Sequence, residues 1–202
     1  FRTIYLRDIV ERYKIQSQAA LERVVDFTMS NIACPLNPTR IANALTTASG
    51  IPTNNHTISR YLSCLEDSFI LSHAQRYDVR GRHYLDFPVK YYATDTGLRN
   101  ARINFRQTEK THLMENVIYN ELLRRGYSVD VGIELEKRIE GHHARPKYEI
   151  DFVVNCGSSR IYIQSAYIIP DAEKRAQETF SLRHTGDSFK KLVITNDPLQ
   201  SR

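Results

Sequence analysis

The stretch YEIDFVVNCGSSRIYIQSAYI, Tyr148–Ile168, decides the fold of the C-terminal half of the chain. Its two runs of β-branched and aromatic residues, 148–154 and 160–168, predict strands. The polar segment NCGSS at 155–159 separates them, a pattern typical of a β-hairpin. A turn of this length, joined so that Val154 faces Ile161, predicts two antiparallel strands.

Side chains alternate between the two faces of a strand, so the first strand has an apolar face and an acidic one. The apolar, core-facing set is Ile150, Phe152 and Val154. The opposite set is Glu149, Asp151 and Val153. In the expected register Asp151 faces Gln164, about 5 Å away at Cβ, so these two polar side chains can share one ion or substrate group.

Further elements surround this hairpin. The sequence predicts a helix over 112–125, a strand over 127–131, a helix over 172–183 and a last strand over 192–195. The order is then α-β-β-β-α-β, which indicates a mixed sheet flanked by helices. Glu115 lies on the first of these helices, at the edge of its apolar stripe, from which it can approach Asp151.

The N-terminal half is organised differently, as helices followed by a hairpin. Its expected elements are a helix over 1–15, a helix around Leu21–Ile32, a helix opened by Asn37-Pro38 and closed by Gly50, a helix over 53–65, and strands over 70–78 and 82–93. This succession predicts a winged helix-turn-helix with 53–65 as its recognition helix.

Three domains follow from these elements. The polar segment TDTGLRNARINFRQTEKT, 94–111, interrupts the hydrophobic pattern, so we place a boundary there. Residues 1–17 end a preceding helical segment, 18–101 form the winged helix and 102–202 the α/β domain.

The winged helix predicts where nucleic acid would bind. The first turn of a recognition helix meets base edges, and arginines of the wing meet phosphates. The predicted DNA contacts are Asn54, Asn55, His56, Thr57, Arg60, Arg76, Arg80 and Arg82. A net charge of +5 and an isoelectric point near 9.1 permit such a partner but do not require it.

The composition restricts the class of protein. The chain begins with a charged segment unlike a signal peptide, and no apolar run approaches bilayer length. Cys34, Cys64 and Cys156 are widely spaced, which fits neither a disulfide framework nor a zinc site. We expect a soluble, cytoplasmic piece of a longer protein without membrane contact.

One set of side chains has the chemistry of a divalent-metal site. Glu115, Asp151 and Gln164 offer the hard oxygen ligands that Mg²⁺ uses where phosphates are cleaved. The alternative is that the acids are solvated edge residues and Gln164 only hydrogen-bonds within its strand. The sequence has no GxxxxGK[ST] segment, so this chain alone does not hold ATP as P-loop proteins do.

Several segments, in order, resemble the C-terminal region of a prokaryotic family of AAA-type P-loop ATPases. They are YLRDIVERYKI (5–15), RYLSCLEDSFIL (60–71), RYDVRGR (76–82), KYYATDTGLRNA (90–101), LMENVIYNELLRRGYSVDVG (113–132), EIDFVV (149–154), YIQSAY (162–167) and KKLVIT (190–195). The resemblance covers nearly the whole chain. It implies a fold of class α+β or α/β, namely a winged helix-turn-helix followed by a restriction-endonuclease-like domain.

The resemblance also implies roles for residues. Glu115, Asp151 and Gln164 match the acidic positions of a PD-(D/E)xK nuclease, but Ala166 stands where that pattern has its lysine. Alanine cannot activate water or stabilise developing negative charge. Lys147 and Lys174 are the nearest replacements in sequence. We therefore expect the nuclease fold to serve as a binding platform without cleavage.

The resulting expectation is a nucleic-acid-binding and coupling module of an ATPase, with DNA and its own N-terminal ATPase domain as partners. ATP and Mg²⁺ would bind in that absent domain, a further Mg²⁺ is possible at the nuclease-like site, and the protein can be an oligomer. Two alternatives stay open: an active Mg²⁺-dependent DNA nuclease using Glu115, Asp151 and Gln164, and a protein-binding adaptor of the ATPase.

Overall fold

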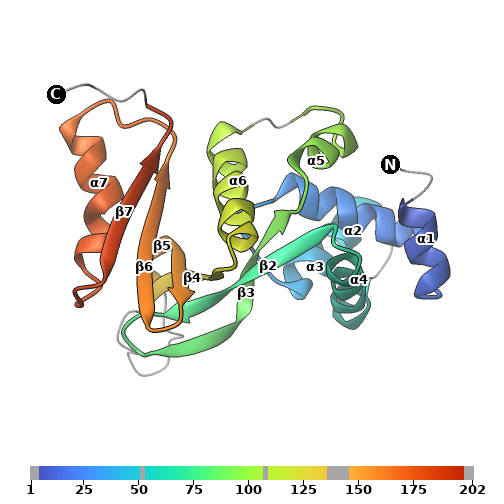
Figure 1. The fold of residues 1–202 in the computed structure, drawn as a ribbon. Helices are drawn as coiled ribbons and strands as arrows, with labels where there is room; N and C mark the ends of the chain where they lie inside the picture. Colours follow the sequence, from blue (N-terminus) through green and yellow to red (C-terminus); the bar gives the residue numbers. More distant parts are fainter. Residues whose placement is uncertain (1–4, 51–52, 107–108, 136–145, 198–202) are drawn as a thin grey trace. The chain divides into compact units, whose positions relative to one another are not determined.

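The computed structural model describes residues 5–50, 53–106, 109–135 and 146–197, and it is a mixed α+β structure (Figure 1). Its helices are α1 (Tyr5–Arg12), α2 (Gln18–Ser30), α3 (Pro38–Ser49), α4 (Asn55–Asp67), α5 (Thr96–Arg102), α6 (Lys110–Arg124) and α7 (Ala172–Arg183). Its strands are β1 (Pro35–Leu36), β2 (Leu71–Asp78), β3 (His83–Ala93), β4 (Ser128–Leu135), β5 (Pro146–Cys156), β6 (Ser159–Ala166) and β7 (Lys190–Thr195).

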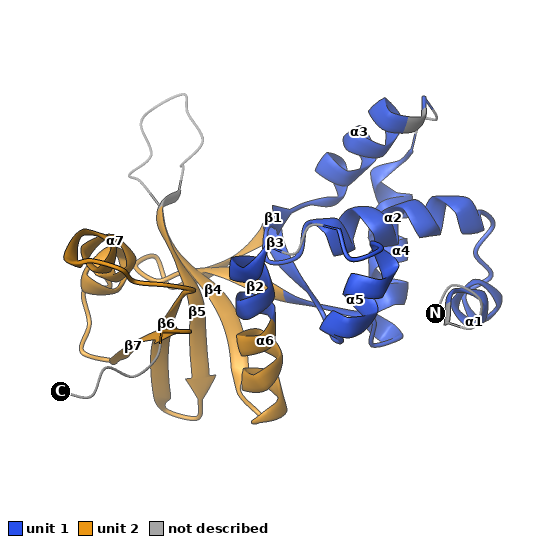
Figure 2. Ribbon diagram, turned by 90° about the horizontal axis from the view of Figure 1, so that it is seen from above, with its two compact units in different colours: residues 1–73, 87–116 blue, residues 74–86, 117–202 orange. Residues whose placement is uncertain are grey.

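The chain forms two compact units, and each contains more than one segment (Figure 2). Unit 1 comprises residues 1–73 and 87–116, and unit 2 comprises residues 74–86 and 117–202. The division differs from the boundary predicted after residue 101. The tip of the β2–β3 hairpin belongs to unit 2, and residues 102–116 belong to unit 1.

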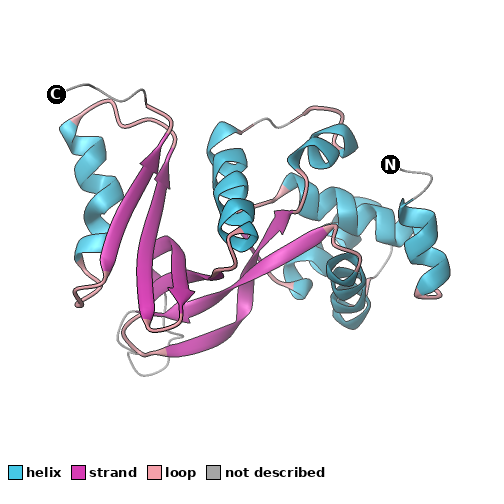
Figure 3. Ribbon diagram, in the orientation of Figure 1, coloured by secondary structure: helices cyan, strands magenta, loops and turns pink. Residues whose placement is uncertain are grey.

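Unit 1 is mainly helical (Figure 3), and α3 begins and ends where the sequence predicts. Asn37 caps α3 by accepting a hydrogen bond from the Arg40 amide at 2.6 Å, and Pro38 occupies the first turn. Gly50 ends the helix in the left-handed conformation, with φ at 68°. These are the expected signals of a capped helix, and they are confirmed.

The core of unit 1 lies among α1, α2, α3 and α4 and the strands beside them. Its largest fully buried side chains include Leu6, Ile9, Leu21, Met29, Ile32, Leu36, Ile41 and Ile58. The short strand β1 lies between α2 and α3 in sequence and pairs antiparallel with β3. The helices and the start of the hairpin therefore share one hydrophobic core.

The polar segment 94–111 contains a helix, α5, that packs within unit 1. Its Arg99 is buried and donates from Nε to the Met29 carbonyl at 2.9 Å, and Arg102 donates from Nε to Asp26. The arginines that make this segment look like a linker are thus buried partners of α2. Sequence composition does not reveal this, because the paired groups are some seventy residues apart in the chain.

Unit 2 contains most of β2 and all of β4, β5, β6 and β7, in the order β2-β4-β5-β6-β7, together with α7 and the second half of α6. Strand β4 is parallel to β2 and antiparallel to β5, while β6 is antiparallel to β5 and parallel to β7. The predicted α-β-β-β-α-β order is confirmed, and Val154 does pair with Ile161. The core of this unit includes Tyr77, Ile150, Val153, Tyr162 and Leu182.

The predicted division of β5 into two faces is wrong between Ile150 and Val153, because the strand contains a bulge there. Asp130 pairs with Val153, but Gly132, two residues on, pairs with Ile150, three residues back. The extra residue reverses the alternation, so Ile150 and Val153 enter the same core. A Cβ at Gly132 would lie 2.7 Å from Val153 Cγ2, so this close approach requires glycine.

Among the residues that the structure describes, no helix has the length and apolar character needed to cross a bilayer. Cys34, Cys64 and Cys156 are free thiols, in agreement with their wide spacing in the sequence.

Candidate functional site

Asp151, a predicted metal ligand, lies in the bulge of β5. Its side chain is only 9% exposed, and its Oδ2 accepts hydrogen bonds from the Ser165 amide at 2.7 Å and the Ser165 hydroxyl at 3.0 Å. The backbone pairing of β5 with β6 ends at the neighbouring residue pair, Phe152 and Ile163. The carboxylate therefore replaces a backbone carbonyl as the acceptor at the end of the ladder.

Gln164 lies beside Asp151, as the predicted register requires. Its Oε1 is 3.4 Å from the Asp151 amide nitrogen and 3.4 Å from the Ser181 hydroxyl on α7. These distances are at the long end for hydrogen bonds, so the amide oxygen is weakly engaged. The two residues are neighbours, and both have roles within the sheet.

Glu115, the third predicted ligand, is buried in unit 1. Its Oε1 accepts hydrogen bonds from Lys90 Nζ at 2.9 Å and from the Tyr92 hydroxyl at 2.8 Å. The neighbouring Asn116 holds both backbone groups of Ala93, at 2.8 Å and 2.7 Å. The first part of α6 is thereby fastened to β3 by polar contacts inside the unit.

Lys90 is a residue that reasoning from the sequence missed. Its side chain is only 4% exposed, and its Nζ contacts a carboxylate, although it stands in an otherwise apolar run, VKYYA. A lysine within a buried strand is itself a signal, because lysine is almost never buried unless it is paired. Of the two lysines proposed to replace the one absent at Ala166, Lys174 pairs with Glu178 on α7, and the side chain of Lys147 lies outside the described residues.

The described part of the chain contains no cluster of three or more His, Cys, Asp or Glu side chains able to hold a metal ion. Glu115 belongs to unit 1, whereas Asp151 and Gln164 belong to unit 2. The convergence of all three on one ion therefore stays a prediction.

The first turn of α4 presents the polar side chains expected of a recognition helix. Asn54 is its N-cap and accepts from the His56 amide at 2.8 Å. Asn54, Asn55 and His56 are exposed and Thr57 is half-buried. Arg60, also exposed, donates one guanidinium hydrogen bond to the Tyr13 carbonyl at 2.7 Å, so part of its side chain is occupied within unit 1.

The three arginines assigned to the wing have three different surroundings, all in unit 2. Arg76 is buried on β2 and lies 3.7 Å from Glu149, so it does not fit a phosphate contact. Arg80 is exposed but pairs with the buried Glu134 at 3.0 Å. Arg82 is exposed, and among the described residues no carboxylate lies within ion-pair distance of it. Of these three arginines, Arg82 is the one whose charge no carboxylate of the described residues neutralises.

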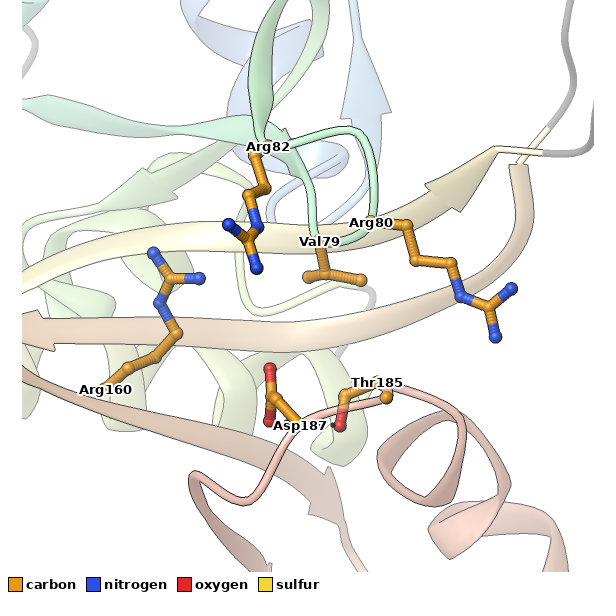
Figure 4. Close-up of a pocket in the computed structure, with 7 residues that line it drawn as sticks. Val79, Arg80, Arg82, Arg160, Thr185 and Asp187 are labelled. Carbon is orange, nitrogen blue, oxygen red and sulfur yellow. Dashed lines mark hydrogen bonds between the residues drawn. The ribbon is translucent and has the colours of Figure 1, made fainter.

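Arg82 lines a hollow of about 360 Å³ within unit 2 (Figure 4). The other lining residues are Val79, Arg80, Arg160, Thr185, Gly186 and Asp187. The guanidinium groups of Arg82 and Arg160 point toward each other, while the side chain of Arg80 points away from both (Figure 4). The hollow thus brings together two arginines that are distant in sequence.

Arg160 is held by aromatic rings and one amide. Its guanidinium carbon lies 4.9 Å from the centre of the Tyr77 ring and 5.7 Å from that of Phe189, and its Nε donates to Asn155 at 3.0 Å. Asn155 in turn contacts Asp130, which accepts from the Tyr84 hydroxyl at 3.0 Å. Burial raises the pKa of Asp130, while the Tyr84 hydrogen bond and the Arg160 charge oppose that rise.

The chain is similar to proteins whose descriptions state no function. An uncharacterised protein of Haemophilus influenzae is 38% identical over 195 residues, which is 96% of this chain and 45% of that protein. A second uncharacterised protein, from Methanocaldococcus jannaschii, is 24% identical over 174 residues, which is 86% of this chain and 36% of that protein. The chain thus spans less than half the length of either relative, and no solved structure matches it. A family model matches residues 1–109, and the chain belongs to that family, described as Domain of unknown function (DUF8612).

Proposed function

We propose that this chain is a nucleic-acid-binding and coupling module of a AAA-type P-loop ATPase, and that its nuclease-like domain is a platform without cleavage activity. The observation that carries the proposal is the exposed first turn of α4, where Asn55 and His56 stand free of the core behind the Asn54 cap. Amide and imidazole groups at the start of a recognition helix are able to read base edges in the major groove.

The order of elements supports this role for α4. Helix α2, strand β1, helices α3 and α4 and strands β2 and β3 follow one another as in a winged helix, with β1 paired to β3. Helix α4 buries Ile58, Tyr61, Leu62 and Leu65 in the core of unit 1, which leaves its first turn available to a partner.

The acids of the nuclease-like pattern support a platform rather than a nuclease. The Asp151 carboxylate accepts from Ser165, and the Glu115 carboxylate accepts from Lys90 and Tyr92, so both have structural partners. Ala166 is buried on β6 and supplies no charge to activate water. The nuclease alternative therefore depends on a lysine from another part of the chain.

The ATPase assignment concerns sequence outside this chain. More than half the length of both relatives lies outside the matched region, which is enough for a further domain. ATP and Mg²⁺ would bind there, because the present sequence has no phosphate-binding loop of the P-loop kind. We expect no ATP hydrolysis by this chain alone.

DNA binding is tested first by its salt dependence. Fluorescence anisotropy with labelled duplex and single strand should give a binding constant that falls linearly with salt on logarithmic axes, because each phosphate contact releases a counterion. A preferred site is first selected from a random duplex library. The double substitution Asn55→Ala/His56→Ala should then reduce affinity for that site about tenfold or more, and reduce affinity for random duplex far less. Gln18→Ala, at an exposed position of α2, is the matched control.

A binding constant that does not respond to salt would instead favour the protein-adaptor alternative. Cleavage is tested separately by plasmid nicking in Mn²⁺ with wild type, Asp151→Ala and Ala166→Lys. We expect none from the first two. Nicking by wild type that disappears in Asp151→Ala would establish the nuclease alternative.

A further inference from the structure

The hollow in unit 2 has the charge and the donors of an anion site. Its lining contains three guanidinium groups, the Thr185 hydroxyl and the backbone of Gly186. Arg80 is neutralised by Glu134, so the charge available to a ligand comes from Arg82 and Arg160. Neither of these two has a carboxylate within ion-pair distance among the residues that the structure describes.

From these contacts we infer that Arg82 and Arg160 bind a phosphate group of a nucleic-acid backbone in this hollow. The inference rests on the proposed function and extends it, because it places a second contact for nucleic acid in unit 2, apart from α4 of unit 1. Arginine suits this ligand, because its planar guanidinium can donate two parallel hydrogen bonds to two oxygens of one phosphate.

Arg160 is positioned before any ligand arrives. Contacts with the Tyr77 and Phe189 rings and the hydrogen bond to Asn155 hold its guanidinium, which lines the hollow and points toward that of Arg82. Arginine loses less conformational entropy on binding when its orientation is already set. A residue that served only as a solvated surface charge would not need three such partners.

Arg82 is positioned by an unusual turn. Its backbone is in the left-handed region, with φ at 55°, and its amide donates to the Asp78 carbonyl at 2.8 Å. The preceding Gly81 allows the turn to close, since a Cβ there would lie 2.5 Å from Asp78 Oδ2. Non-glycine residues adopt this conformation at a cost in conformational free energy, and such strain is concentrated at functional positions.

Asp187 places a carboxylate in the same lining, which opposes an anion, but its oxygens are already engaged. It accepts from the Tyr162 hydroxyl at 2.6 Å, from Thr185 at 3.3 Å and from the Phe189 amide at 3.2 Å, and Lys191 lies 3.6 Å away. Burial, followed by the bond to Asp187, raises the pKa of Tyr162 to about 12, so this donor persists at neutral pH. The net charge facing a ligand stays positive.

The size of the hollow favours a phosphate that is part of a larger molecule. A volume of about 360 Å³ exceeds that of a single phosphate ion and accommodates the attached sugars as well. A backbone phosphodiester and a free nucleotide share this chemistry, and we assign the phosphodiester because the proposed function is nucleic-acid binding.

The test uses the whole chain and observes NMR signals of residues that line the hollow. In ¹H–¹⁵N spectra, the Gly186 amide and the Nε–H groups of Arg82 and Arg160 are observed while a short oligothymidylate without terminal phosphate is added, and then ATP in a separate titration. We expect the oligothymidylate to move these signals, and Arg82→Gln/Arg160→Gln to abolish the response. The spectra also report whether the variant is folded.

The same variants are measured by anisotropy with duplex and single strand. The double substitution should weaken binding about 10- to 100-fold at low salt and reduce the salt slope by about one to two units, whereas Arg175→Gln, an exposed arginine of α7, should change each by much less. DNA binding that is unchanged by the double substitution, with no movement of Gly186, would overturn this inference and leave the proposed function standing.

Two further outcomes also decide between the alternatives. Movement of Gly186 by oligothymidylate in a chain that fails to bind duplex would support the inference and reject the role of α4. Tighter binding of ATP than of oligothymidylate would assign the hollow to a free nucleotide and overturn the phosphodiester.

Discussion

Two pairs of charged side chains, one in each unit, show how differently this chain treats a buried and an exposed cation. In unit 1, Lys90 is almost fully buried and is neutralised by Glu115 at 2.9 Å. In unit 2, Arg82 and Arg160 point toward each other beside a hollow and have no such carboxylate among the described residues. Lys90, Arg82 and Arg160 are all basic residues on or beside strands, yet the environment of Lys90 implies a role opposite to that of the two arginines.

Burial and pairing together separate structural from functional charge in this protein. A buried ion pair has exchanged its water for a partner inside the unit, so losing either member leaves an unbalanced charge in a poorly polarisable environment. Two cations held near each other gain nothing from each other, and their arrangement is useful only when an anion joins them. The sequence motifs alone do not make this distinction.

The largest effect is expected at the buried pair. Lys90→Met should lower the free energy of unfolding by about 3–5 kcal/mol, because it leaves the Glu115 carboxylate buried with one donor fewer. The measurement is urea denaturation, with Lys174→Met as control, since Lys174 forms a partly exposed i,i+4 pair with Glu178 whose loss should cost about 0.5 kcal/mol or less. Similar losses in the two variants would remove the contrast between the units.

A smaller effect of opposite sign is expected at Arg82. Arg82→Gly relieves the left-handed backbone and should raise the free energy of unfolding by up to about 1 kcal/mol, while DNA affinity falls. Arg82→Lys keeps both the strain and the charge and serves as the control. If stability and affinity fall together in Arg82→Gly, the side chain has a structural role that its exposed position does not suggest.

Neutralising the acid of the hollow should sharpen the contrast further. Asp187→Asn removes a negative charge from the lining while keeping an oxygen that accepts from Tyr162, so DNA affinity should rise about two- to fivefold at low salt. Fluorescence anisotropy measures the DNA affinity. Glu173→Gln, which removes an exposed acid of α7, controls for the change of one unit in net charge. Equal gains in both variants would mean that the hollow has no special share in binding.

The smallest effect concerns a pair of intermediate exposure in unit 1, His73 with Glu66. The hydrogen bond from His73 to Glu66 raises the pKa of His73 against the opposing effect of burial. A raised folded-state pKa stabilises the fold fully below the unfolded value of about 6.5, and this stabilisation is lost as pH rises through the folded pKa. The His73 titration by NMR should shift to lower pH in Glu66→Gln. An unchanged titration would show that Glu66 does not affect the pKa of His73 in this partly exposed pair.

The sequence alone predicted most of the elements and both ends of α3, but it did not predict β1 or α5. Asn37-Pro38 and Gly50 set the limits of α3 because caps act through the nearest backbone groups, and the NCGSS turn set the pairing of Val154 with Ile161 for the same reason. Asp151 and Gln164 were correctly predicted as neighbours, since hairpin register depends on a few adjacent residues. These are local properties, and a short stretch of sequence contains all their causes.

Only the tertiary structure decided which charged residues are buried and which are available. Arg76, Arg80 and Arg82 look alike in RYDVRGR, but Glu149 and Glu134 neutralise the first two from distant strands. Arg160 gave no signal in the sequence, because the rings of Tyr77 and Phe189 that hold it come from other parts of the chain. The bulge in β5 likewise depends on Gly132 of the neighbouring strand. A side chain's electrostatic environment is a sum over neighbours in space, and no local pattern contains that sum.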